Sequence, residues 1–193
     1  MKKNKSKILP VIILLAGVIM ISAVVAYFAI TAVRASGAKK DSEQILHRIN
    51  SMIPDPRPGI IEEGRDNFMP VLSIDGTDYI GIIAVPAYKT ELPVASVWNE
   101  KNSKRLVTRY CGTLQENNLV LGADNAYGLF DFSKEITKDD KLFFTDTEGI
   151  IYTYIVEDVI RTTKLSSEKL AYDGLTIFIR SKASKDVIIV YCK

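Results

Sequence analysis

The sequence is poor in the side chains that most enzymes use for covalent and metal chemistry. Its 193 residues include two cysteines, Cys111 and Cys192, and one histidine, His47. Two cysteines are too few for a disulfide scaffold or a zinc site with thiolate ligands. In an oxidising compartment the two cysteines could form one disulfide. The alternative is that they are two half-buried apolar residues. Because the sequence also lacks a phosphate-binding glycine loop and a cluster of metal ligands, we predict no cofactor and no metal.

Neither sign of charge predominates strongly in the part of the chain that we expect to fold. The formal net charge is +2, with 10 Lys and Arg against 6 Asp and Glu up to residue 70, and 15 against 17 from residue 71 onward. A nucleic-acid partner needs a basic face that releases counterions from phosphates. The slightly acidic C-terminal part therefore argues against nucleic-acid binding. Its length suits one domain with one core.

One long apolar run lies near the N-terminus. It extends from Ile8 to Val33 and follows four lysines, Lys2, Lys3, Lys5 and Lys7. About 26 residues at about 1.5 Å each give about 39 Å, more than the hydrocarbon core of about 30 Å. We predict a transmembrane signal anchor at residues 8–33, a cytoplasmic tail at 1–7 and an extracellular remainder. The alternative is a cleaved signal peptide, but residues 34–38 hold no convincing cleavage site.

Residues 34–70 read as a connection between this anchor and a folded domain. The stretch from Ala35 to Asn50 is polar, and Asp41-Ser42 could cap a helix, so we predict a short stalk helix. The prolines and glycine between residues 54 and 59 predict an extended spacer without regular structure, which the polar residues 62–66 continue. His47 has no nucleophile near it in sequence, and we interpret it as a solvated helix residue.

From Val71 onward the sequence reads as short strands separated by turns. The clearest β-branched and aromatic runs cover residues 79–85, 91–94, 118–122, 138–145, 150–160, 175–179 and 187–191. Asp146 to Gly149 is typical of a hairpin turn whose glycine takes positive φ. A short helix or a turn is expected at 129–136, and a single helical turn at 166–169. About eight strands without βα repeats predict an all-β barrel over residues 71–193.

Several of these runs resemble the framework of the sortases, in particular class B-like members. Tyr79 to Pro86, followed by Leu92-Pro-Val94, is similar to the family's opening pair, Gly-x-Ile-x-Ile-Pro and Leu-Pro-Val. Asn118-Leu-Val-Leu-Gly122 is similar to the strand that precedes the family's histidine. The runs 175–179 and 187–191 resemble the last two strands, which carry its cysteine and arginine. The resemblance covers roughly residues 79–193 and implies a closed, roughly eight-stranded sortase-type barrel.

All three catalytic positions implied by the resemblance carry other residues. The histidine position falls on Asp124, the cysteine position on Arg180 and the arginine position on Asp186. Tyr127 and Phe130 match the aromatic loop downstream of the histidine. An arginine guanidinium stays protonated and cannot be a nucleophile, an aspartate is a poor proton donor to an amine near neutral pH, and Asp186 would repel an oxyanion.

These substitutions exchange the signs of the charges at the site. One cation now stands between two carboxylates, and we predict that Arg180 bridges Asp124 and Asp186 in a charge-assisted network. With Tyr127 and Phe130, these residues form the predicted binding site. Such a network stabilises a fold or marks a binding spot, and it does not cleave peptides.

The residues and the resemblance together predict a membrane-anchored pseudoenzyme that acts by binding in surface-protein anchoring or pilus assembly. The resemblance implies a Gram-positive cell surface and, as partner, a sorting-signal-like peptide, a surface or pilus protein, or an active sortase. An apolar groove beside Asp124 and Arg180 would favour this reading.

Two other functions stay open. One is a sortase-type transpeptidase or hydrolase that uses a non-standard nucleophile. The candidates are Cys111, Cys192 and Ser181, with Lys182 or Lys185 as a base. The other is a structural spacer in the cell envelope, which a filled groove would favour.

Overall fold

The computed structural model of the protein describes residues 5–59, 68–181 and 184–193. The chain divides into two compact units, Met1–Gly37 and Ala38–Lys193. The predicted polar linker at 62–66, Lys182 and the first four residues of the predicted cytoplasmic tail lie outside the described residues.

The N-terminal unit is the first part of helix α1 (Lys5–Met52). From Pro10 onward this helix is long and apolar enough to cross a membrane, with a mean hydropathy of 2.8 in its apolar window and none of that window buried in protein. The hydroxyls of Ser22 and Thr31 donate to carbonyls one turn earlier at 2.8 Å, so neither needs a partner from water. This is consistent with the predicted anchor at residues 8–33.

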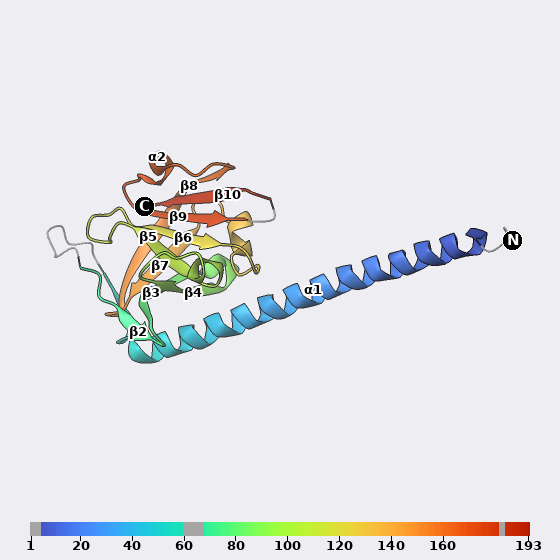
Figure 1. Ribbon diagram of the computed structural model, residues 1–193. Coiled ribbons are helices and arrows are strands. Elements are labelled where there is room, and N and C mark those ends of the chain that lie inside the picture. The colour runs from blue at the N-terminus through green and yellow to red at the C-terminus, as the bar shows by residue number, and fades with distance from the viewer. Residues whose placement is uncertain (1–4, 60–67, 182–183) are drawn as a thin grey trace. The chain divides into compact units, whose positions relative to one another are not determined.

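The second unit is organised around a closed β-barrel (Figure 1). Its strands pair in the order β3–β4–β5–β6–β9–β10–β8–β7, and β7 pairs back with β3. The strands are β3 (Thr77–Val85), β4 (Thr90–Ala95), β5 (Val107–Cys111), β6 (Val120–Asp124), β7 (Lys141–Asp146), β8 (Ile150–Thr162), β9 (Leu175–Arg180) and β10 (Val187–Cys192). The predicted eight-stranded barrel is confirmed.

The connections include four short helical elements and one tight hairpin. The helical elements are η1 (Pro86–Tyr88), η2 (Asn102–Lys104), η3 (Asp131–Lys134) and α2 (Ser167–Leu170). The predicted turn between β7 and β8 is confirmed, with Gly149 at φ +77°. The Asp146 carboxylate accepts the amides of Glu148 and Ile150, each at 2.9 Å, and its burial raises its pKa.

Two further strands extend the sheet beyond the ring. Strand β2 (Leu72–Ile74) pairs with β3, and β1 (Arg57–Pro58) runs parallel to the start of β8. The amide of Arg57 donates to the carbonyl of Gly149 at 2.8 Å. The prediction of a spacer without regular structure is therefore wrong at Arg57 and Pro58, because the β7–β8 hairpin offers this segment a free strand edge.

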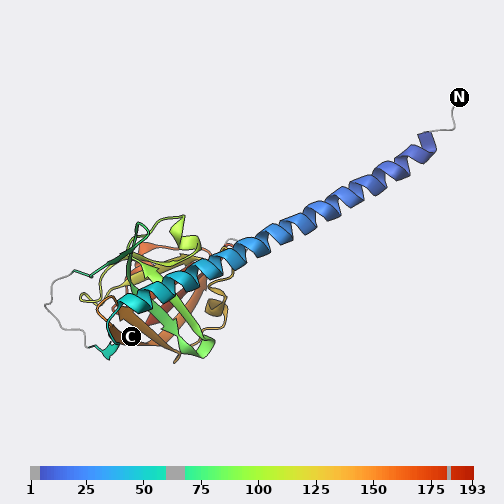
Figure 2. The same cartoon turned by 90° about the horizontal axis from the view of Figure 1, so that it is seen from below.

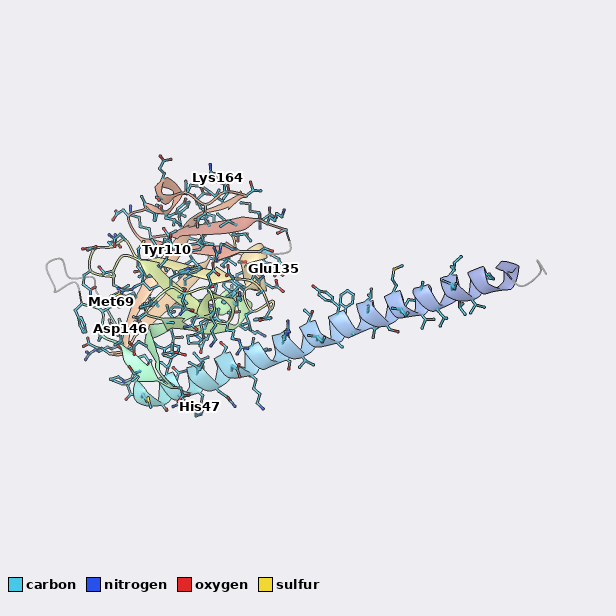
Figure 3. All side chains as sticks on the ribbon, viewed as in Figure 1. His47, Met69, Tyr110, Glu135, Asp146 and Lys164 are labelled. Atoms are coloured by element: carbon cyan, nitrogen blue, oxygen red, sulfur yellow. The ribbon has the colours of Figure 1, made fainter. Side chains whose placement is uncertain are left out.

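Alternation along the strands places one set of side chains inside the barrel and another outside. Leu175, Ile177 and Ile179 of β9 belong to the central core, whereas Phe178 belongs to a smaller cluster on the outer face. Side chains fill the interior of the barrel (Figure 3), which is therefore a packed core and not a channel.

The C-terminal part of α1 packs against the barrel, which the predicted stalk did not anticipate. It runs unbroken to Met52, and its residues from Ala38 belong to the barrel unit (Figure 2). Apolar residues of the helix end pack on β2, β3, β4 and the segment before β5; they are Ile45, Leu46, Ile49 and Ile53, against Ile74, Tyr79, Ile82, Ala95 and Leu106. A domain boundary at residue 71 would separate these two sides of one cluster.

Candidate functional site

The strand pairing brings the three predicted site positions to one end of the barrel. β6 and β9 are parallel, and Asp124 lies in register with Arg180 at their C-terminal ends. β10 is antiparallel to β9 and places Val187 opposite Arg180, so that Asp186 stands at the same end. β-branched and aromatic residues in β9 and β10 favour this pairing. Because β6, β9 and β10 are neighbours in the sheet, the three residues lie at the same end of adjacent strands.

Asp124 and Arg180 form a bidentate ion pair. Arg180 donates from Nε to Asp124 Oδ1 at 2.6 Å and from Nη2 to Oδ2 at 3.1 Å. The side chain of Asp124 is only 3% exposed and that of Arg180 is 38% exposed. Ser103 of η2, which is fully buried, adds a hydrogen bond from its hydroxyl to Oδ2 at 2.9 Å. All the buried charge on Asp124 is thus matched by donors, as a buried carboxylate requires.

Aromatic rings hold the arginine from its other side. The guanidinium of Arg180 lies 4.9 Å from the ring centroid of Trp98, a cation–π contact. Trp98 also packs against Tyr110 and Phe178, at centroid distances of 5.7 and 5.4 Å. Gly122 makes this packing possible, since a Cβ there would meet the ring of Phe178 and stand 2.6 Å from Trp98 Cζ3.

Asp186 does not take the bridging role predicted for it. Among the described residues, Arg180 forms its one ion pair with Asp124. The contact that Asp186 makes here is through its backbone, whose carbonyl accepts the amide of Ser181 at 2.8 Å. Asp186 is half-exposed and lines the adjacent cavity.

A cavity of about 400 Å³ opens beside the ion pair, and we call it the groove. Asp124, Arg180 and Asp186 line it, with six more side chains from three connections: Glu100, Lys104, Thr163, Leu165, Ser181 and Lys185. Leu165 and Val187 are its apolar members, so the groove persists, but most of its lining residues are polar or charged, unlike the apolar groove expected. Sequence patterns did not single out Ser103 or Trp98; the one available signal was that Trp98 is the single tryptophan.

The two aromatic residues predicted for binding do not line the groove. Phe130 is fully buried in the barrel core, so its role is packing. Tyr127 is half-buried in the loop after β6. That loop is held by Asn125, whose side-chain oxygen accepts the amide of Phe130 at 3.3 Å and whose amide donates to Asp131 at 2.8 Å. A hydrogen bond from Lys134 lowers the pKa of Asp131.

Both cysteines are free thiols and lie away from the groove. In the sheet Cys111 pairs with Val120 at the start of β6, and Cys192 pairs with Leu175 at the start of β9. Four residues of strand separate Val120 from Asp124 and five separate Leu175 from Arg180, about 13 and 17 Å. Burial raises the pKa of Cys111, an effect that nearby Arg109 opposes, and raises the pKa of Cys192 to about 12.

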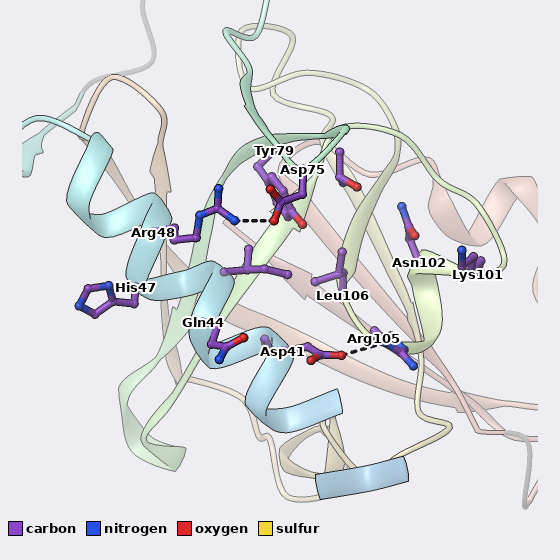
Figure 4. A pocket seen from close by; sticks show the side chains of 13 residues that line it. Asp41, Gln44, His47, Arg48, Asp75, Tyr79, Lys101, Asn102, Arg105 and Leu106 are labelled. Atoms are coloured by element: carbon purple, nitrogen blue, oxygen red, sulfur yellow. Dashed lines mark hydrogen bonds and ion pairs between the residues drawn. The ribbon is translucent and has the colours of Figure 1, made fainter. Parts of the chain in front are cut away.

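Among the described residues, which exclude Lys182, the remaining candidates for covalent chemistry also lack an activating partner. Ser181 lines the groove, but Lys185 beside it is exposed rather than desolvated. His47 lies on α1 and lines a different cavity (Figure 4). Within the described residues, no group of three or more His, Cys, Asp or Glu could hold a metal ion.

No protein-family model and no curated protein matches the sequence. Among solved structures the chain is similar to "Sortase C1 of GBS Pilus Island 1", with a TM-score of 0.52 and 21% identity over 60% of this chain and 63% of that one, less than two thirds of its length. It is also similar to a Clostridium perfringens sortase D5 transpeptidase, with a TM-score of 0.54 and 15% identity over 84% of this chain and 97% of that one. For sortase C from C. perfringens SM101 the TM-score is 0.51 and the identity is 16%, over 84% of this chain and 88% of that one.

These likenesses show that the protein has the sortase fold. The closed eight-stranded barrel is shared, as the sequence resemblance predicted. At identities below 25%, the likeness concerns the fold and leaves the class and the chemistry to the residues themselves.

Proposed function

We propose that this protein is a membrane-anchored, non-catalytic sortase-fold module that binds a peptide or protein partner of the cell envelope. The observation that carries the proposal is the buried, bidentate Asp124–Arg180 pair. It occupies the two positions at which the sequence resemblance expects the histidine and the cysteine. Acyl transfer needs a nucleophile and a proton donor there, and a neutralised ion pair supplies neither.

The placement of the thiols supports the same proposal. A thiolate is the reactive form of cysteine. Burial disfavours it at Cys192, and Cys111, whose pKa is also raised, is exposed at the end of the barrel away from the groove. An open groove of about 400 Å³ beside Arg180 supports binding over a role as spacer alone. Its charged rim, with Lys104 and Asp186 in no ion pair among the described residues, offers partners to a peptide backbone and its termini.

The similar solved structures support one class of partner. One of them is a pilus-island sortase and another a transpeptidase. We therefore propose a sorting-signal-like peptide, carried by a surface or pilus protein, as the ligand of the groove. An active sortase is the alternative partner, and the anchor at residues 8–33 would hold the barrel at the outer face of the membrane.

The test uses the full chain in detergent micelles, fluorescent Leu-Pro-x-Thr-like peptides and an amine acceptor. We expect saturable binding by anisotropy and no cleaved or transferred product. Lys104→Ala should weaken binding several-fold, because Lys104 lines the groove. Lys101→Ala is the matched control, since Lys101 lies three residues away and lines the cavity beside α1.

The assay also separates the competing enzyme function. Product that disappears in Cys111→Ser, Cys192→Ser or Ser181→Ala would identify a nucleophile and overturn the non-catalytic proposal. Absence of both product and saturable binding would leave the barrel as a spacer.

A further inference from the structure

The segment of residues 98–106, between β4 and β5, stands between the groove and helix α1. Glu100 and Lys104 of this segment line the groove. Lys101 and Arg105 line a second cavity of about 560 Å³, which lies against residues 41–48 of α1 (Figure 4). One short segment therefore provides a wall to two separate cavities, one on each of its faces.

At its groove side the segment is bonded directly to the ion pair. Ser103 donates to Asp124 Oδ2 at 2.9 Å, and both side chains are buried. Trp98, at the beginning of the segment, stacks on the guanidinium of Arg180. The segment thus touches both members of the pair, so that a change at either one alters a contact of the segment.

At its other side the segment is bonded directly to the helix. Arg105 Nη1 donates to Asp41 Oδ2 at 2.9 Å. The next residue, Leu106, is 6% exposed and packs in the cluster that contains Ile45 and Ile49 of α1. Two residues of chain, at most about 7 Å, separate the groove contact of Ser103 from the helix contact of Arg105.

Internal hydrogen bonds give the segment little freedom between these contacts. The side chain of Asn99 accepts the amides of Lys101 and Asn102 at 3.1 and 2.7 Å. The carbonyl of Asn102 accepts the amides of Arg105 and Leu106, each at 2.8 Å. A turn bonded in this way moves as a body, and a shift at one side displaces the other.

We propose that the 98–106 segment couples the Asp124–Arg180 pair to the docking of helix α1 on the barrel. A ligand that displaces Arg180 or Trp98 in the groove would then loosen or tighten the helix end, and the docked helix would set the affinity of the groove by the same factor. Whether a ligand loosens or tightens the helix end rests on the proposed binding function, whereas the coupling between the ion pair and the helix requires no ligand. It makes the membrane-proximal helix a regulatory element of the groove.

The first test perturbs the helix and observes the groove. Asp41→Ala removes the contact with Arg105; both side chains are half-exposed, so the protein should still fold. The emission of Trp98, the single tryptophan of the chain, should shift to the red. Amide hydrogen exchange in residues 98–104 should rise up to about fivefold, the size of a surface ion-pair contribution of about 1 kcal/mol.

The matched control is Arg48→Ala. Arg48 makes the other ion pair between α1 and the barrel, but its partner Asp75 lies in the β2–β3 turn and not in the segment. Arg48→Ala should loosen the helix end without changing Trp98 emission. Equal changes of emission in both variants would mean general undocking of the helix and would overturn the proposal.

The second test runs in the opposite direction. Ser103→Ala removes the hydrogen bond to Asp124, and amide exchange in residues 41–49 of α1 should rise about fivefold or more. Thr108→Val is its control, because the Thr108 hydroxyl is equally buried and donates to the Gly122 carbonyl of β6 at 3.1 Å, outside the segment. Unchanged exchange in the helix of the Ser103 variant would also overturn the coupling. Neither result depends on a peptide, so a failure here is distinct from a failure of the binding assay.

Discussion

The two ends of strands β6 and β9 differ in chemistry. At their C-terminal ends Asp124 and Arg180 form a fully bonded ion pair at the floor of an open groove. At their N-terminal ends lie Cys111 and Cys192, thiols whose pKa values burial raises. The chain thus holds its two thiols at the end away from the groove, and at the groove it holds charges that neutralise each other.

Removal of Arg180 should have the largest effect on stability. Arg180→Ala leaves the Asp124 carboxylate, 3% exposed, without its counter-ion, and breaking one partner of a buried pair costs about 3–5 kcal/mol. Because Arg180 is 38% exposed, we expect about 3 kcal/mol, measured as the loss of unfolding free energy in urea.

A double-mutant cycle sharpens this result. Asp124→Asn with Arg180→Ala should recover much of the loss, because no charge is then left buried. The same cycle with Asp186→Asn should show no coupling to Arg180. Strong coupling to Asp186, or none to Asp124, would contradict the pair described at this end.

An added methyl group at Gly122 should be the next most damaging change. Gly122→Ala forces the rings of Phe178 and Trp98 apart, and overpacking of this kind costs about 1–3 kcal/mol. Trp98 emission and thermal unfolding should change together. A variant with unchanged stability and emission would mean that the rings of Phe178 and Trp98 are loosely packed over Gly122.

At the opposite end, Cys192→Ser should cost roughly 1–2 kcal/mol, because it buries a hydroxyl in an apolar site. The variant should also change the pH dependence. Cys192 has its pKa raised from 9.0 to about 12, so the folded thiol keeps its proton while the unfolded one ionises. Its contribution is intact below pH 9.0 and is lost at about 1.4 kcal/mol per pH unit between these values.

Serine does not ionise in this range, so the variant should be less sensitive to alkali than the parent protein. Unfolding free energies at pH 8 and pH 10 test this. Equal slopes for the two proteins would show that Cys192 is less buried than described.

Replacement of Thr176, at the same end of the barrel as Cys192, should have a smaller effect and should stabilise the protein. The Thr176 hydroxyl is buried without a hydrogen-bond partner among the described residues. Thr176→Val removes that unpaired group at nearly constant volume and should stabilise the protein by about 1 kcal/mol, measured by urea unfolding. Serine at this position keeps the hydroxyl and should bring no gain.

Cys111→Ser should change least. The residue is exposed, and surface substitutions of this kind stay within about 0.5 kcal/mol. Cys111 should react with a thiol reagent in the native state, whereas Cys192 should react only after unfolding. Rapid labelling of both would erase the contrast between a surface thiol and a core thiol.

Much of the barrel could be predicted from local sequence. Runs such as Leu175 to Ile179 and Val187 to Tyr191 carry β-branched residues between turn residues, and both became adjacent antiparallel strands. The pairing of Arg180 with Asp124 could be predicted because the resemblance placed both residues at one site and their charges are opposite. The absence of an Asp186 bridge could not be predicted, because it depends on the direction in which the guanidinium edges point.

The contributions of helix α1 and the 98–106 segment were missed for a different reason. Ile45, Ile49 and Ile53 recur every four residues, a helical period that indicates a packed face, but the polar residues between them made the stretch read as solvated. Trp98 and Ser103 lie in a connection without periodicity. Their positions depend on tertiary contacts with Arg180 and Asp124, which no local pattern reports.

The attachment of the helix end and of strand β1 also affects how the protein would respond to mechanical tension. A flexible spacer would lengthen under a weak pull on the barrel. Here residues 45–53 must first peel from their cluster, and Arg57 must separate from the hairpin at Gly149. Both events precede any rupture of the eight-stranded ring. The chain thus has two releasable attachments in series that would absorb force while the eight-stranded ring stays intact.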